Sequence, residues 1–284
     1  MHKHPLLFTA KFLFCIAIFS NHSLSLGAEG KLLATAGLSQ VEGSGGGGLV
    51  PWATLSGYDS HDELSLSVSV SSAELNDYRL AVQTLSASFY DRVEVSVAQQ
   101  RFDLKTSGVD IKQHIIGLKY KLYGDAVYGY SPQLSLGLQH KKNEDATIPN
   151  ALGAASSSGT DIYFAATKVH LGAISGYNTV WNLTARATKA NELGILGFGG
   201  PSNDRYELMV EASAGILLSR NLVIGVEYRQ KPDNLNLGED DWFDVFFSYI
   251  PNKNLSLTVA WTELGSIAGA AKQDGLYISL NGHL

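Results

Sequence analysis

The stretch Asn254-Leu255-Ser256-Leu257-Thr258-Val259-Ala260-Trp261-Thr262 decides the fold of this 284-residue chain. Apolar and polar residues alternate along it, so Leu255, Leu257, Val259 and Trp261 share one face of an extended strand. Strands of about ten residues that are apolar on one face only are typical of transmembrane β-barrels. A closed barrel also satisfies every backbone N–H and C=O inside a bilayer without a helix.

The same unit repeats from Leu134 to the C-terminus, and its connections alternate between short and long. Bacterial barrels alternate in this way between short periplasmic turns and longer outer loops, which places both termini on the periplasmic side. The longer connections are expected at Glu42–Gly48, Ser71–Asp77, Lys105–Asp110, Lys142–Gly159, Asn191–Asn203, Pro232–Asp240 and Gly265–Lys272.

The strands between these connections predict an all-β protein, a transmembrane antiparallel β-barrel of about fourteen strands. The alternative is a barrel of about twelve strands. It applies if Lys31–Val41 and Leu49–Tyr58 form an inner plug or rim structure instead of two strands.

Residues 1–28 have the pattern of a signal peptide, which leaves residues 29–284 for the barrel. Lys3 and Lys11 supply the positive charge, and Phe12–Phe19 supply the apolar core. Cleavage is expected after Ala28, with Ser25 as the other option. The single cysteine of the chain lies within the apolar core of this leader, so the mature chain would need no disulfide.

The charge balance of the mature chain argues against nucleic-acid binding. Of 21 basic residues two lie in the leader, which leaves 19 against 27 acidic residues and a net charge of −8. Nucleic-acid binders usually show a basic balance and a basic face. No apolar run outside the leader is long enough for a helical membrane span.

Charged residues of both signs fall on the inward positions of the expected strands. A basic group that faced lipid at mid-membrane would cost about 2–4 kcal/mol, so these residues are expected to face a lumen. The two readings of this set are a pore lining that selects permeants and a salt-bridged network that fills the barrel. The candidates are Glu94, Lys119, Lys121, Arg186, Glu207, Glu211, Glu227, Arg229 and Asp244.

Two glycine-rich segments stand out. Glu42–Gly48 reads EGSGGGG, but no Gly-Lys-Ser/Thr follows it, so it is expected to be a flexible outer loop and not a phosphate-binding loop. Asn191–Gly200 reads NELGILGFGG and places apolar residues among glycines in a long loop. It is either a constriction that folds inward as a gate or an ordinary packed outer loop.

The sequence contains no residue pattern typical of a catalytic site or of a metal site. The histidines of the mature chain stand singly, and no serine lies at a suggestive spacing from any of them. The acidic run Glu239-Asp240-Asp241 is expected to be a solvated loop, and no zinc-type pattern occurs. We therefore expect no catalytic residues, no metal site and no cofactor.

The last strand carries a second signal. Gln273, Gly275, Ile278 and Leu280 give the order polar, glycine and two spaced apolar residues. This order resembles the terminal-strand signal that the barrel-assembly machinery of the outer membrane reads. The chain ends on Leu284, whereas that signal usually ends on an aromatic residue.

The mature chain resembles a family of uncharacterised Gram-negative outer-membrane proteins, domain of unknown function 3034. The resemblance implies a β-barrel in the bacterial outer membrane, and it supplies no activity and no site residues. It rests on Gly30–Gly37, Gly48–Ala53, Tyr90–Glu94, Gln100–Asp103, Ala187–Asn191, Gly197–Gly200, Glu227–Leu235 and Gln273–Leu280.

Three functions follow as hypotheses. The first is a passive, porin-like channel for small hydrophilic solutes, and the second is a closed structural or surface-interaction barrel that does not conduct. The third, an outer-membrane lipid-modifying enzyme, has the least support in the sequence. The expected partners are outer-membrane lipid and lipopolysaccharide, the barrel-assembly machinery and small hydrophilic solutes, with no nucleic acid among them.

Overall fold

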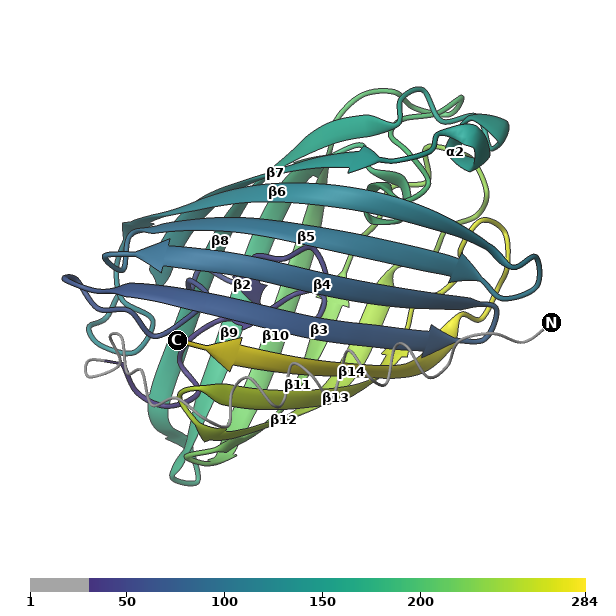
Figure 1. Ribbon diagram of the computed structural model, residues 1–284. Helices are drawn as coiled ribbons and strands as arrows, with labels where there is room; N and C mark the ends of the chain where they lie inside the picture. Colours follow the sequence, from purple (N-terminus) through teal and green to yellow (C-terminus); the bar gives the residue numbers. More distant parts are fainter. Residues whose placement is uncertain (1–30) are drawn as a thin grey trace.

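The computed structural model describes residues 31–284, and residues 64–283 of these form a closed antiparallel barrel (Figure 1). The predicted signal peptide, residues 1–28, lies outside the described residues. The twelve strands are β3 (Leu64–Leu75), β4 (Tyr78–Phe89), β5 (Val93–Leu104), β6 (Val109–Tyr123), β7 (Gln133–Asn143), β8 (Ser158–Ile174), β9 (Tyr177–Thr188), β10 (Glu207–Ser219), β11 (Leu222–Arg229), β12 (Trp242–Asn252), β13 (Leu255–Glu263) and β14 (Asp274–His283). The count of fourteen is therefore wrong, and the alternative of twelve is confirmed.

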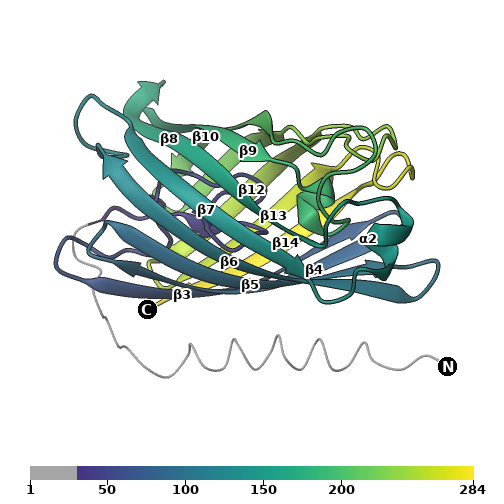
Figure 2. The ribbon, with the colours of Figure 1, turned by 90° about the horizontal axis from the view of Figure 1, so that it is seen from above.

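Each strand pairs with its neighbours in the chain, and β14 closes the barrel on β3 (Figure 2). Gly275, Ile278 and Leu280 of the candidate assembly signal lie on β14, at this closing seam. Gln273 precedes the strand, is buried and donates a hydrogen bond to Asp77 Oδ2 at 2.7 Å. Recognition of these residues by an assembly machinery stays a prediction.

The barrel is apolar outside and carries many polar and charged residues inside, the reverse of a water-soluble protein, although apolar residues also pack in its interior. Along β3 the exposed residues include Leu64 and Leu66, and the buried ones are Ser65, Ser67, Ser69 and Ser71, followed by Ala73 and Leu75 near the outer end. The other strands expose leucine, valine, isoleucine and aromatic side chains in the same alternation. A closed sheet with a lipid-facing apolar exterior is the form in which bacterial outer-membrane proteins span their membrane, so the chain is an outer-membrane β-barrel.

From β7 to β14 the connections alternate between long ones at one rim and short ones at the other, as the sequence predicts. Earlier in the chain this prediction is wrong, because the outer connections after β3 and β5 have two and four residues, whereas the periplasmic connection after β6 has nine. Short turns such as those after β8 and β10 lie at one end, together with the C-terminus, and this end faces the periplasm in bacterial barrels. The opposite, outer end holds the long loops, which include the helix α2 (Thr147–Ala151) and the 3₁₀ turn η1 (Asn191–Gly194). Among the described residues no helix is long and apolar enough to cross a membrane.

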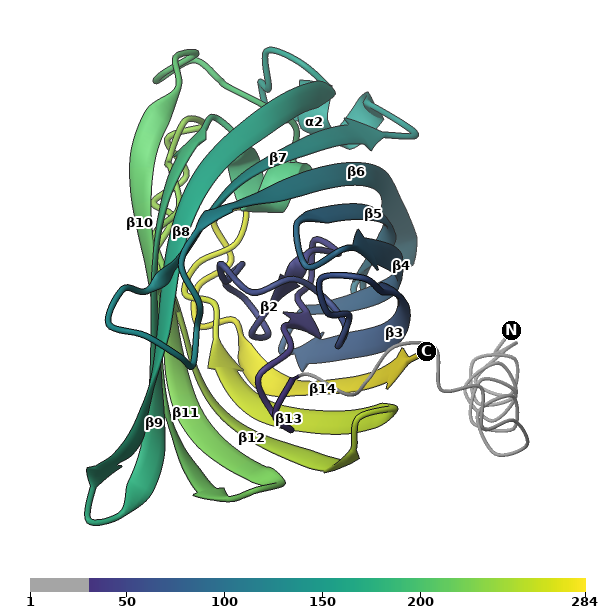
Figure 3. The same cartoon turned by 90° about the vertical axis from the view of Figure 1, so that its left-hand side faces the viewer.

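Two of the expected long outer loops differ in the structure. The connection expected at Ser71–Asp77 is a two-residue turn, because β3 continues to Leu75. Glu42–Gly48, expected to be flexible and solvated, is fully buried inside the barrel. A glycine-rich segment behaves as a flexible linker when it is surrounded by solvent. Here the barrel wall encloses the segment Glu42–Gly48, so it is packed in place (Figure 3).

Residues 31–63, hereafter the plug, fill the lumen from the periplasmic end (Figure 3). The chain doubles back within the plug, where β1 (Leu38–Ser39) pairs antiparallel with β2 (Gly45–Gly46). Glycine is required where the plug backbone approaches the wall. A Cβ on Gly47 would overlap the carboxylate of Glu227 on β11, whereas a Cβ on Gly48 would lie 3.3 Å from its nearest neighbour, Tyr277 Cε1.

This difference predicts that Gly47→Ala loosens the plug while the barrel still folds. The overlap with Glu227 should destabilise the bound position of the plug in the lumen by about 1–3 kcal/mol, which is the usual cost of overpacking a closely packed site. Hydrogen–deuterium exchange of plug amides measures the effect, with exchange of the barrel strands as the internal reference. Gly48→Ala is the matched control and should change exchange much less. Equal protection of the plug in the two variants would contradict the close fit at Gly47.

Candidate functional site

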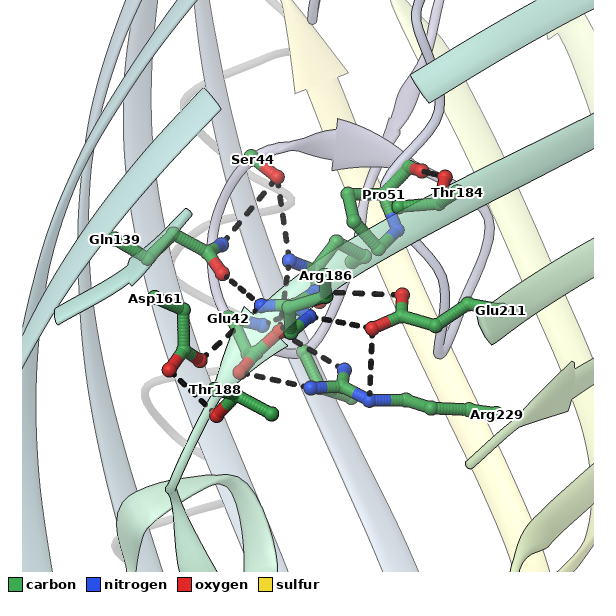
Figure 4. A network of polar contacts seen from close by, with 12 residues as sticks. Glu42, Ser44, Pro51, Gln139, Asp161, Thr184, Arg186, Thr188, Glu211 and Arg229 are labelled. Atoms are coloured by element: carbon green, nitrogen blue, oxygen red, sulfur yellow. Dashed lines mark hydrogen bonds and ion pairs between the residues drawn. The ribbon is translucent and has the colours of Figure 1, made fainter. Parts of the chain in front are cut away.

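The centre of the lumen holds a carboxylate of the plug, Glu42, among three cations of the wall. Figure 4 shows Glu42 with two of these cations, Arg186 and Arg229. Lys141 on β7, Arg186 on β9 and Arg229 on β11 all point inward, because each sits on the polar face of its strand. Arg229 Nη1 donates to Glu42 Oε2 at 2.9 Å and Nη2 donates to Oε1 at 3.2 Å. Arg186 Nη2 lies 3.1 Å from Glu42 Oε2, and Lys141 Nζ pairs with Oε1.

Two wall carboxylates complete this cluster. Asp161 on β8 accepts from Lys141 Nζ at 2.6 Å and lies 3.3 Å from Arg186 Nη1. Glu211 on β10 pairs with Arg186 Nε and lies 3.5 Å from Arg229 Nε. The six side chains are at most 7% exposed. Three positive and three negative groups therefore neutralise one another in the buried centre, which is the condition under which burial of charge is tolerated.

A second pair, nearer the periplasmic end, holds the plug by its backbone. Glu94 on β5 accepts from the backbone N–H of Gly45 at 2.9 Å and of Ser56 at 2.6 Å. Lys119 on β6 donates to the carbonyls of Gly45 at 2.6 Å and Thr54 at 3.0 Å. Glu94 Oε1 and Lys119 Nζ are 3.6 Å apart. Glu94 and Lys119 thus supply hydrogen-bond partners for plug N–H and C=O groups that have no partner in a β-sheet.

A third contact between the wall and the plug is made by Glu227 on β11, whose two carboxylate oxygens both accept hydrogen bonds. Its Oε2 accepts from the N–H groups of Gly48 at 2.7 Å and Leu49 at 2.6 Å, and its Oε1 accepts from Ser213 Oγ at 2.7 Å. Asp244 on β12 is directly opposite Glu227 in the sheet. Neither oxygen of Asp244 has a hydrogen-bond partner among the described residues.

The outer end of the lumen is covered by the loop Asn191–Gly200, which folds inward. Residues 191–199 are buried, and Asn143 Nδ2 on β7 donates to the carbonyls of Gly194 at 3.1 Å and Ile195 at 3.0 Å. Of the two alternatives for this loop, an inward fold or an ordinary packed outer loop, the structure shows the inward fold. Glu192 and Leu193 adopt positive φ angles of 46° and 62°, a backbone conformation that residues other than glycine rarely adopt.

Lys231 fixes this loop to its neighbours. Its Nζ lies 2.5 Å from Glu192 Oε1 and 2.8 Å from Glu239 Oε2 and also donates to the carbonyl of Ser266. Burial raises the pKa of the Glu192 carboxyl to about 8, against the opposing charge of Lys231. The hydrogen bond with Glu239 raises it further. Glu192 is thus protonated in the closed loop at neutral pH.

The periplasmic end is also closed by ion pairs. Lys31 Nζ lies 2.8 Å from Asp91 Oδ1 and 3.9 Å from Asp59 Oδ1, so the two ends of the plug meet at one rim position. Lys121 pairs with the same Asp91. A cavity of about 210 Å³ lies beside them and is lined in part by Thr54 and Gln133. Cavities of about 30 and 10 Å³ lie deeper in the lumen.

The structure places the nine candidate charges as follows. Seven are almost fully buried in the lumen, and Lys121 and Glu207 lie near the periplasmic and outer rims. Five of the nine contact the plug directly, namely Glu94, Lys119, Arg186, Glu227 and Arg229. In the closed state their inward faces meet plug atoms and not an aqueous pore, so a pore-lining role stays a prediction.

Sequence reasoning missed three members of the central cluster. Lys141 has the parity opposite to that of the lipid-facing Leu134, Leu136 and Leu138, so strict use of the two-residue period would have found it on the inward face. Asp161 lies near the start of β8, a strand whose two faces look alike in the sequence. Glu42 was hidden in the glycine run, and only its long-range partners reveal it.

Two histidines contact a hydroxyl group in the fold, although the sequence suggested that they stand alone. His283 Nδ1 lies 2.8 Å from Ser67 Oγ inside the barrel, and His140 Nδ1 lies 2.9 Å from Thr160 Oγ1 outside it. Within residues 31–284 neither pair has a carboxylate partner, so neither forms a triad. Residues 31–284 also contain no group of three or more His, Cys, Asp or Glu side chains that could hold a metal ion.

Comparison with known proteins gives a family and a set of similar barrels. The family described as “Protein of unknown function (DUF3034)” matches residues 35–281. No curated protein matches the sequence. Among solved structures, the KdgM porin is 11% identical with a TM-score of 0.49, covering 76% of this chain and 98% of that one.

Two further solved structures are similar to this extent. The Acinetobacter baumannii outer membrane protein Omp33 is 10% identical with a TM-score of 0.45, covering 79% of this chain and 99% of that one. The COG4313 outer membrane channel from Pseudomonas putida F1 is 12% identical with a TM-score of 0.42, covering 78% and 95%. At these identities and TM-scores, none of the solved structures indicates a substrate for this chain.

The protonated Glu192 makes closure of the outer loop dependent on pH. The closed loop holds a proton that an open loop, with an ordinary carboxyl pKa near 4.5, would release. Closure is therefore fully favoured below pH 4.5 and weakens as the pH rises through about 8. Amide exchange in residues 191–199, corrected for its intrinsic pH dependence, should report this weakening.

The matched variant for this experiment is Glu192→Gln, which keeps the shape and cannot release a proton. Its loop should show the same corrected protection at pH 5 and pH 8. A wild-type loop whose protection rises with pH would contradict the assignment of the proton to Glu192.

Proposed function

This chain belongs to the DUF3034 family, and we propose that its barrel is a gated outer-membrane channel for small hydrophilic solutes. The plug is the periplasmic gate of this channel and the Asn191–Gly200 loop is the outer gate. The proposal keeps the solute class expected for a porin-like channel and replaces passive conduction by gated conduction. The lipid-facing exterior would contact outer-membrane lipid and lipopolysaccharide, and both partners stay predictions.

The observation that carries the proposal is the path of the plug. It enters and leaves the lumen at the periplasmic rim, where Lys31 and Asp59 lie 3.9 Å apart. A segment that enters and leaves by one opening can withdraw without any threading of the chain. Among the described residues the plug is continuous with the barrel only through Glu63, so withdrawal needs no change in the wall.

The chemistry of the contact supports a removable plug. Many contacts between the plug and the wall are polar, for example Gln100 Nε2 to the Val41 carbonyl at 2.7 Å and Ser135 Oγ to the Ala53 carbonyl at 2.6 Å, although Val41, Leu49 and Val50 of the plug also pack in an apolar cluster with the wall. Water can replace such bonds at a small net cost of roughly 1 kcal/mol each. After withdrawal the serine residues on the inward face of β3 would line a hydrated pore, beside an apolar strip that includes Val180, Leu217 and Phe246.

One observation favours the second hypothesis, a closed structural barrel. The central cluster around Glu42 is fully neutralised, and removing one partner of a buried pair typically costs about 3–5 kcal/mol. A plug bound this strongly could remain in place for the life of the protein. Conductance distinguishes the two functions, because a permanently plugged barrel carries no current.

A reversible cross-link between plug and wall tests the gate. Ser56 Oγ in the plug and Ser86 Oγ on β4 lie 2.7 Å apart, so the double variant S56C/S86C should form a disulfide. The only natural cysteine of the chain lies in the leader, so no other thiol interferes. Reduced channels in a planar bilayer should show discrete current steps, and oxidised channels should be silent.

The matched control joins two wall strands in place of plug and wall. Ser248 Oγ and Thr258 Oγ1 lie 2.7 Å apart on β12 and β13, and S248C/T258C should conduct equally when oxidised or reduced. Silence of folded barrels under reducing conditions would support the closed structural barrel. Current through the oxidised S56C/S86C variant would show that the plug is not the gate.

A further inference from the structure

We propose that Lys141, Arg186 and Arg229 form a recognition site for a carboxylate on the permeant solute, and that Glu42 of the plug occupies this site in the closed state. The inference rests on the proposed channel function and specifies its solute as a small hydroxylated carboxylate, such as a sugar acid. Glu42 then acts as a tethered competitor of the solute.

The geometry around Glu42 is that of a carboxylate receptor. Arg229 presents both Nη atoms to the two carboxylate oxygens, at 2.9 and 3.2 Å. Arg186 approaches one oxygen at 3.1 Å, and Lys141 pairs with the other. The two-pronged approach of a guanidinium to a carboxylate is the arrangement that recognises this group most specifically.

The site belongs to the wall and does not depend on the plug for its shape. Its cations sit on β7, β9 and β11, and Asp161 and Glu211 on the intervening strands hold them in place. Without Glu42 the wall carries three positive and two negative charges in this cluster. A vacated site is therefore electropositive by one unit and would attract a monocarboxylate.

Glu42 differs in kind from the other anchors of the plug. Glu94, Lys119 and Glu227 bind backbone N–H and C=O groups, which any peptide would offer. The remaining described charges of the plug, Lys31, Asp59, Asp62 and Glu63, lie toward its periplasmic ends. Glu42 is thus the single charge that the described plug places at the centre of the lumen.

The neighbouring side chains suit a hydroxylated solute. Gln100 Nε2 donates to the Val41 carbonyl, and Gln139 Nε2 lies 3.5 Å from Ser44 Oγ, so both amides have plug groups as partners. Withdrawal of the plug would free these two donors beside the vacated cations. Hydroxyl groups next to a carboxylate would replace the plug atoms as partners.

Chemical rescue of the full-length protein tests the site without any measurement of current. Glu42→Ala removes a group of the size of acetate, so acetate can enter the gap beside the three cations. The variant should unfold at a lower temperature than wild type in a heat-modifiability assay. Acetate should raise that temperature with increasing concentration, whereas acetamide, and sodium chloride at equal ionic strength, should not. Equal responses to acetate and acetamide, or no response, would overturn the proposal.

Two other variants serve as controls and remain informative if Glu42→Ala fails to fold. Glu42→Gln keeps the volume and loses the charge, so it should be less stable than wild type and gain nothing from acetate. The double variant E42Q/K141Q removes one charge of each sign and should unfold closer to wild type than E42Q does. A double variant less stable than both single variants would contradict a site built on charge balance.

The identity of the permeant is tested on the conducting wild-type channel. D-glucuronate should lengthen the open periods, because it competes with Glu42 for the cations, and D-glucose should not. Lys141→Gln should weaken the glucuronate effect roughly tenfold, as expected for the loss of one charge-assisted contact. Lys168→Gln, which removes a cation bonded to the turn after β6, should leave it unchanged.

The two experiments separate failure of this inference from failure of the channel. Acetate rescue with equal effects of glucuronate and glucose would remove the solute from the site and overturn the permeant assignment. Silence of the reduced S56C/S86C channel would contradict conduction itself, whatever the result with acetate.

Discussion

The neutralisation of Glu42 by Lys141, Arg186 and Arg229 is the interaction on which the closed structure depends. Six charged side chains lie together in the centre of a barrel that is surrounded by lipid. Charges in such surroundings are tolerated only as complete sets, since an unpaired member costs several kcal/mol. Five of the six come from the wall and the sixth from the plug, so the wall is electrostatically complete only when the plug is in place.

This constraint connects residues that lie far apart in the sequence. Glu42 is 99 residues from Lys141 and 187 from Arg229, and the contacts form only when the barrel has closed around the plug. The anchors at Glu94, Lys119 and Glu227 then fix the backbone of the plug on the periplasmic side of the centre. Glycine allows this path, because a side chain at Gly47 would occupy the space of the Glu227 carboxylate.

The barrel could be predicted from the sequence because its signal is local. A two-residue period within each strand and the alternation of connection lengths identify the topology, and they place Arg186 and Glu211 on inward positions. The plug could not be predicted in the same way, because Glu42–Gly48 has no apolar pattern and its burial is produced by polar partners far along the chain. Asp161 was missed because both faces of its strand look alike, and Lys141 could have been found by strand parity alone.

The same argument implies that whatever opens the lumen must replace the charge that leaves with the plug. Single-channel recording of Glu42→Ala beside wild type, in identical bilayers and buffers, tests this most directly. The account predicts that the variant opens far more often than wild type, because its plug no longer completes the central cluster. Equal open probabilities of the two proteins, with both shown to be folded, would contradict it.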